Sequence, residues 1–92
     1  QLNTMDKIKV NETARLEKLN ATYQVNLETI KKQAATGQLY FTIQFHLPNY
    51  MDGFEVQKKL EAHGIECCER GFSSVQQDDG SYSFRIHFRM KE

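Results

Sequence analysis

The stretch Leu39–Leu47, which reads LYFTIQFHL, decides the fold class of this chain. Apolar side chains occupy every second position and alternate with Tyr40, Thr42, Gln44 and His46. This period of two is typical of a half-buried β-strand with one apolar face. A proline and an asparagine follow directly, and both residue types end strands.

A second alternating stretch, Tyr82–Met90, predicts the last strand of the same sheet. The sequence Gln77–Gly80 ends in Asp-Gly, which is a strong signal for a hairpin turn. Upstream of that turn we expect a weaker strand from Ile65 to about Gln77. Gly71 interrupts its alternation and indicates a bulge or a bend.

Two segments have helical spacing instead. Residues 52–63 predict a short helix, in which Asp52 and Glu55 have the spacing of a capping box and a glycine follows the end. Before the first strand, apolar residues recur every three or four positions and predict a helix from about residue 4 to 36. Asn3 or Thr4 would cap the start of this helix, and a glycine would end it.

The expected fold is α+β, with the elements in the order α-β-α-β-β. We predict a single domain over residues 1–92, made of a long helix to about residue 36 and a β-α-β-β unit from residue 37 to 92. A strand–helix–strand unit crosses over in the right-handed sense. The last strand then lies either at an edge or, as we prefer, between the other two and antiparallel to both. Both helices cover the one apolar face.

The first helix is longer than the sheet that would cover it. A helix of about 33 residues is roughly 50 Å long, whereas a strand of about nine residues spans only about 30 Å. The excess of about 20 Å either frays or packs against another protein or a second copy of the chain. The predicted partner-binding residues are Met5, Ile8, Leu16, Leu19 and Tyr23.

The polar face of the sheet supports an alternative function. Arginines beside an aromatic side chain on an open sheet bind phosphates and stack on bases. The candidate anion-binding or nucleic-acid-binding residues are Tyr40, Arg85, His87 and Arg89. The competing interpretation is an ordinary solvated face. The formal net charge of zero, from 12 basic and 12 acidic residues, favours that interpretation.

The composition also narrows the compartment. No apolar run approaches the roughly 20 residues that span a bilayer, so no membrane association is expected. Cys67 and Cys68 are neighbours, and a bridge between adjacent cysteines is strained. Free thiols and no recognisable signal peptide predict a cytoplasmic protein.

Sequence motifs give no support for an enzyme. No nucleophile elbow, phosphate-binding loop or dinucleotide fingerprint occurs in the chain. Asp78 and Asp79 are explained by the hairpin turn, and the cysteines and histidines lack the spaced pairs of a zinc site. We expect neither a catalytic residue nor a metal nor a cofactor. Capture of a nucleotide-like ligand at an oligomer interface stays open as a third possibility.

From residue 34 onward the chain resembles a group of small phage-encoded accessory proteins of unassigned function. The resemblance is carried by Ala34–Gly37, Leu39–Leu47, Leu60–Ile65 and Asp79–Phe84. It implies a phage or mobile-element protein that acts in the bacterial cytoplasm by binding a host factor. The group offers no functional residues that could be assigned to positions in this sequence.

Overall fold

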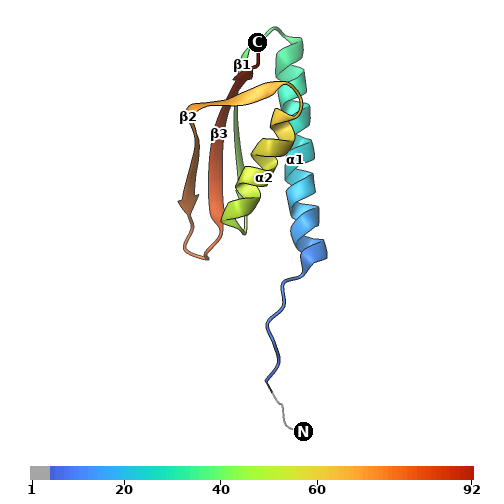
Figure 1. The fold of residues 1–92 in the computed structure, drawn as a ribbon, viewed down its shortest axis with the longest axis vertical. Helices are drawn as coiled ribbons and strands as arrows, with labels where there is room; N and C mark the ends of the chain where they lie inside the picture. The colour runs from blue at the N-terminus through green and yellow to red at the C-terminus, as the bar shows by residue number, and fades with distance from the viewer. Residues whose placement is uncertain (1–4) are drawn as a thin grey trace.

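The computed structural model describes residues 5–92 of the chain. Two helices and three strands follow one another in the predicted order, so the α+β fold class is confirmed (Figure 1). No helix in the described part of the chain has the length and apolar character needed to cross a bilayer. The elements are α1 (Glu12–Ala35), β1 (Tyr40–Leu47), α2 (Tyr50–Glu61), β2 (Ile65–Gln76) and β3 (Tyr82–Met90).

The three strands form one sheet in the order β1-β3-β2, with β3 antiparallel to both neighbours. The predicted central position of the last strand is therefore confirmed. The hairpin between β2 and β3 turns where the Asp-Gly signal predicted it, and the Gln77 N–H donates to the Ser81 carbonyl at 2.7 Å. As a consequence of this order, β1 and β2 are the two edges of the sheet.

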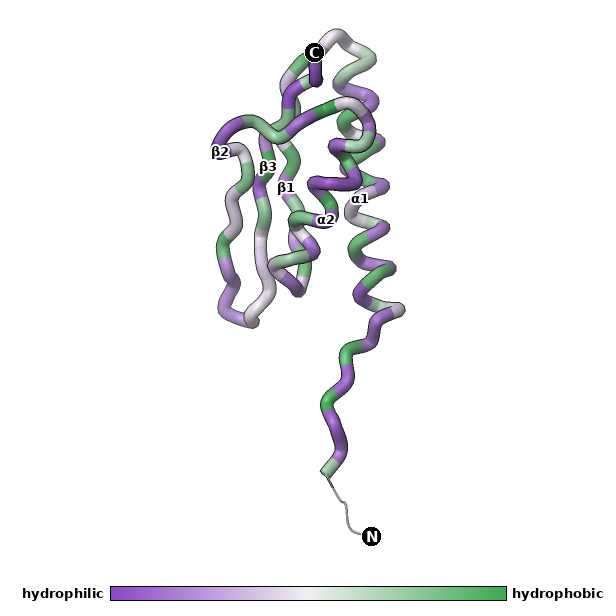
Figure 2. The backbone as a smooth tube through the Cα atoms, viewed as in Figure 1, coloured by the Kyte–Doolittle hydropathy of each residue, from purple (hydrophilic) through white to green (hydrophobic). Residues whose placement is uncertain are grey.

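The apolar core lies between one face of the sheet and both helices. Phe41 faces Phe88 across the β1–β3 ladder, and Ile43 faces Ile86, so the apolar side chains of the two strands form continuous rows. Hydropathy alternates along the strands as this pattern requires (Figure 2). The helices contribute Leu19, Leu27, Ile30, Val56 and Leu60 to the same core.

Helix α1 begins at Glu12 and not near residue 4, which corrects the predicted start. Asn11 caps it, because its Oδ1 accepts a hydrogen bond from the Ala14 N–H at 3.0 Å. Residues 5–11 form neither helix nor strand, and their chain leads away from the domain (Figure 1). The proposed caps Asn3 and Thr4 lie outside the described residues.

The shorter helix removes most of the expected excess length. With 24 residues, α1 is about 36 Å long, and the nine residues of β3 span about 30 Å. The helix therefore matches the sheet within about 6 Å. The length of α1 therefore gives no reason to expect a partner.

Helix α2 starts at Tyr50, two residues before the predicted start, with Asn49 in the N-cap position. Asp52 is consequently a residue of the first turn and not the cap. It is almost fully buried, at 4% exposure. Arg15 of α1 compensates the buried charge, because its Nη1 lies 2.7 Å from Asp52 Oδ1. This ion pair joins the first turns of the two helices.

Strand β2 contains the predicted irregularity. Cys67 is opposite Phe88, whereas Phe72 is opposite Ile86, so residues 68–71 bulge out of the ladder. Gly71 is required there, because a Cβ atom on it would lie only 2.7 Å from the Cys68 carbonyl oxygen and 2.8 Å from that of His87. The bulge bends β2 sharply across the sheet (Figure 1).

Candidate functional site

The residues predicted to bind a partner do not form one surface. Leu19 is 3% exposed and belongs to the core. Tyr23 is half-buried, and its hydroxyl lies 2.6 Å from His63 Nε2 at the end of α2. Both side chains are therefore engaged within the protomer. Met5 and Ile8 are exposed, but they precede α1. Of the five predicted residues, Leu16 is the one that lies both in α1 and on its exposed surface.

The polar face of the sheet is formed as predicted and is not covered by either helix. We call it the open face. Its side chains come from alternate positions of the strands, which the register places in cross-strand rows. The residues on β1 and β3 are Tyr40, Thr42, Gln44, His46, Ser83, Arg85, His87 and Arg89.

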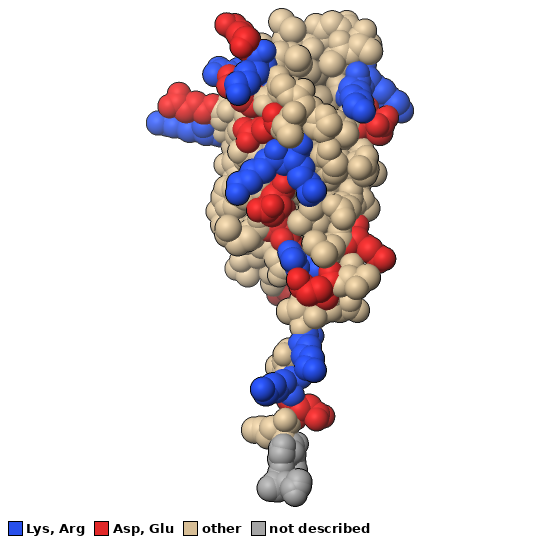
Figure 3. All heavy atoms as spheres, turned by 45° about the vertical axis from the view of Figure 1, so that its right-hand side comes forward, with Lys and Arg blue, Asp and Glu red and all other residues tan. Residues whose placement is uncertain are grey.

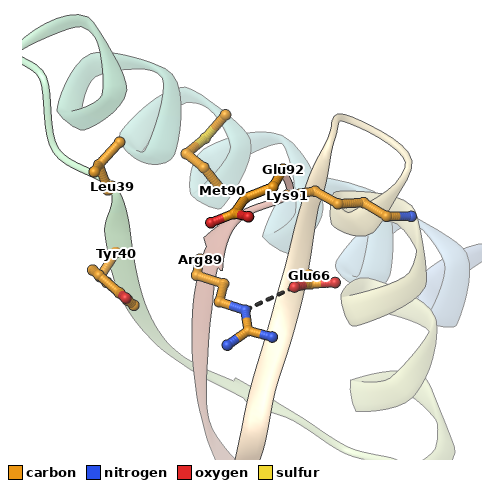
Figure 4. A pocket seen from close by; sticks show the side chains of 7 residues that line it. All are labelled: Leu39, Tyr40, Glu66, Arg89, Met90, Lys91 and Glu92. Atoms are coloured by element: carbon orange, nitrogen blue, oxygen red, sulfur yellow. Dashed lines mark hydrogen bonds and ion pairs between the residues drawn. The ribbon is translucent and has the colours of Figure 1, made fainter.

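One end of the open face is hollowed into a depression of about 500 Å³. Tyr40, Arg89 and Glu66 form a row across its floor (Figure 4). Arg89 Nε lies 2.7 Å from Glu66 Oε2, and this hydrogen bond raises the pKa of the arginine. Since Glu66 neutralises the guanidinium, the depression is a weak site for an anion.

The other predicted anion-binding residues differ in their bonding. His87 Nδ1 lies 2.7 Å from Thr42 Oγ1, so the ring is fixed on the open face. Arg85 is exposed, and no carboxylate in residues 5–92 approaches it within ion-pair distance. Arg85 is therefore the predicted cation that remains available to a ligand.

A second polar cluster lies at the β2–β3 hairpin. The Ser81 hydroxyl donates to Asp79 Oδ1 at 2.6 Å and lies 2.7 Å from His46 Nε2. The hydrogen bonds from the Ser81 hydroxyl and backbone N–H lower the pKa of Asp79. A nucleophilic serine must give its proton to the imidazole, whereas Ser81 gives it to the carboxylate. The cluster is thus explained as a stabilised turn.

Cys67 and Cys68 are neighbours in β2, and both are half-buried. Burial raises the pKa of the Cys67 thiol, which disfavours the thiolate. Both cysteines are free. Within residues 5–92, no group of three or more histidine, cysteine or acidic side chains is arranged to hold a metal ion.

The two edges of the sheet differ in a way that the sequence interpretation missed. An open edge pairs with other chains unless charges, bulges or prolines interrupt it. Edge strand β2 carries the bulge and three charged residues, Glu66, Glu69 and Arg70. Edge strand β1 has no charge, no proline and no bulge along its eight residues. The signal was visible in the sequence, because residues 33–51 contain no Asp, Glu, Lys or Arg.

Hydrogen-bond alternation defines which groups β1 presents on its outer side. The Met90 N–H donates to the Leu39 carbonyl at 2.9 Å, so odd-numbered residues of β1 bond to β3. The backbone groups of Thr42, Gln44 and His46 therefore point outward. No side chain in residues 5–92 hydrogen-bonds to them, whereas the Gln38 side chain donates to the Tyr40 carbonyl at 2.8 Å. We call this outward row of Thr42, Gln44 and His46 the β1 edge.

A shallow groove of about 290 Å³ runs between the β1 edge and α1. Phe45 lines it from the strand and is half-buried, while Val25 lines it from the helix and is 65% exposed. On the helical side of the molecule, basic and acidic side chains lie next to one another without a patch of one sign (Figure 3). The β1 edge thus combines unpaired backbone groups with an adjoining apolar surface.

Comparison of the chain with family models, with curated proteins and with solved structures found no match. The resemblance to small phage-encoded proteins therefore stays a prediction.

Proposed function

We propose that this domain is a non-enzymatic binding module that takes an extended segment of polypeptide onto the β1 edge. The observation that carries the proposal is the contrast between an uninterrupted, uncharged edge on β1 and a bulged, charged edge on β2. Protein association was the function expected from the sequence. The surface proposed for it here is the edge of the sheet and not the first helix.

Strand addition would use both the β1 edge and the apolar groove beside it. The outward backbone groups of Thr42, Gln44 and His46 would continue the ladder, which supplies affinity without regard to sequence. Side chains of the added strand alternate between the two faces. One set would enter the groove beside Phe45 and Val25, and apolar residues there would be favoured.

The test uses an edge variant and a matched control. Peptides are selected from a random library for binding to the protein, and their affinities are measured by calorimetry. Gln44→Pro removes an outward N–H without breaking a bond to β3, so binding should weaken at least about tenfold. Gln76→Pro makes the same substitution on β2. Because the Gln77 N–H donates to Ser81 of the hairpin, the N–H of Gln76 points outward, away from β3. This control variant should bind the peptides like the wild type.

Amide hydrogen exchange supplies the second readout for the same complexes. Selected peptides should slow exchange at Thr42, Gln44 and His46 relative to the free protein. Peptides that protect amides of α1 instead, and that bind Gln44→Pro as tightly as the wild type, would refute the proposal.

The bacterial cytoplasm is the proposed compartment, supported by the two free cysteines.

Arg85 supports one alternative function, the binding of single-stranded nucleic acid on the open face. It is exposed and has no acidic partner among residues 5–92, and Tyr40 offers an exposed ring for stacking on the same face. Titration with single-stranded RNA should then show affinity that falls steeply between about 50 and 200 mM salt. Arg85→Gln should weaken it, while Lys58→Gln on α2 should not. No binding at the lower salt concentration would eliminate this function.

A further inference from the structure

We propose that the segment bound at the β1 edge is β1 of a second copy of this chain, which makes the protein a two-fold symmetric dimer. The two sheets would join antiparallel into one continuous sheet of six strands. The inference rests on the proposed function and names its partner. It differs from binding of a foreign peptide in that every contact must be self-complementary.

One register of two antiparallel β1 strands satisfies the outward groups of both. With the symmetry axis at Gln44, this residue lies opposite its own copy, and Thr42 lies opposite His46 of the second copy. All three residues of the β1 edge are then paired. The ladder ends where Pro48, which has no N–H, meets Tyr40, whose carbonyl is already bonded to Gln38.

The same register matches the apolar side chains. On the core face, Ile43 of one copy lies opposite Phe45 of the other, and a β-branched residue beside an aromatic one is a favourable cross-strand pair. Phe45 is the residue of this row that β3 and the helices leave half-buried. The exposed side chain of Val25 lies beside it in the groove, so pairing would remove both from water.

Charge supports a second copy as the partner. In a self-paired antiparallel ladder, a charge at the symmetry axis faces an identical charge, and like charges directly opposite destabilise a ladder. The absence of any charged residue between positions 33 and 51 removes that penalty. The formal net charge of the chain is zero, so two copies do not repel each other at long range.

The test is a charge exchange at the symmetry axis, followed by sedimentation velocity over protein concentrations up to about 1 mM. The wild type should dimerise. Gln44→Lys or Gln44→Glu alone places two like charges opposite each other across the interface, so each should weaken the dimer at least about tenfold. A mixture of the two variants should form a heterodimer. Gln76→Lys, the same change on β2, should dimerise like the wild type.

Each contrary outcome separates the inference from the proposed function. A wild type that stays monomeric at about 1 mM, yet binds selected peptides at the β1 edge, would overturn the second copy and leave strand addition intact. A dimer that persists in both Gln44 variants would place the contact elsewhere and overturn the inference. Circular dichroism of each variant ensures that loss of dimer is not loss of fold.

Discussion

Gly53 shows how a single missing side chain determines the packing of α2. It is buried within the helix, and a Cβ atom on it would lie 2.6 Å from Cδ1 and 2.7 Å from Cζ of Phe84. The ring of Phe84 is held by two neighbouring aromatic rings. Its centroid lies 5.0 Å from that of the Phe45 ring and 5.8 Å from that of the Phe72 ring. The glycine therefore lets α2 approach the sheet closely at the centre of the core.

We predict that Gly53→Ala destabilises the protein although alanine is the better helix former. Helix propensity alone would stabilise by about 1 kcal/mol, whereas overpacking a rigid core costs about 1–3 kcal/mol. The steric effect outweighs propensity because the ring of Phe84 cannot move aside, so we expect a net loss of up to about 2 kcal/mol. Urea denaturation measures it, with Glu55→Ala on the exposed side of the helix as a control. A gain in stability would show that the ring yields.

At the scale of elements, alternation along the strands was sufficient to predict the sheet. The five elements and the irregularity at Gly71 follow from periodicity and turn residues in the sequence. The sequence left two places open for β3, and the preferred central place is the one found. The reason is physical, because a strand with one buried face must alternate and its turns require particular backbone angles. The β1 and β3 residues of the open face follow from the same alternation. On β2 the sequence suggested Glu66, Cys68 and Arg70, whereas the bulge takes residues 68–71 out of the ladder and the register places Ser73 and Val75 on this face.

The start of α1 was predicted poorly because two patterns compete there. Ile8 and Val10 alternate with Lys7 and Lys9, which is a strand-like pattern, whereas Met5, Ile8 and Leu16 have helical spacing. Asn11 followed by Glu12 is a sound N-cap and first-turn pair, and it marks the start that the structure shows. Apolar periodicity predicts structure poorly in a segment that does not pack on the core, because such a segment needs no regular apolar stripe.

The candidate site could be predicted only in part, because it belongs to the edge and not to a set of side chains. Tyr40, Arg85, His87 and Arg89 do share a face as predicted, but the pairing of Arg89 with Glu66 depends on strand order and register. The β1 edge is made of backbone groups, which leave no signature of residue type. Only the lack of charge over residues 33–51 hints at it.

At the scale of the whole molecule, α1 is held to the β-α-β-β unit by apolar and polar contacts together. Leu19, Leu27 and Ile30 enter the core along most of its length. The Arg15–Asp52 pair closes the end nearest the N-terminus, and Asn49 Nδ2 adds a hydrogen bond to Asp52 Oδ2 at 3.3 Å. A buried carboxylate in the first turn of a helix is favoured by the helix dipole, and the arginine ties that turn to α1.

We therefore predict that Asp52→Ala loosens the attachment of α1 and lowers the melting temperature by at least about 5 °C, the shift that about 1 kcal/mol produces in a domain of this size. Glu28→Ala is the matched control. It removes an ion pair with Lys31 that is fully on the surface at 3.8 Å, so it should change the melting temperature by less than about 3 °C. Thermal unfolding followed by circular dichroism measures both. If the melting temperature fell by the same small amount in both variants, the Arg15–Asp52 pair would not stabilise the contact between the helices. If amide exchange in Asp52→Ala accelerates more in the first turns of α1 and α2 than in the core, the ion pair is the contact that joins the two helices. Global destabilisation alone would accelerate exchange to the same extent throughout the core.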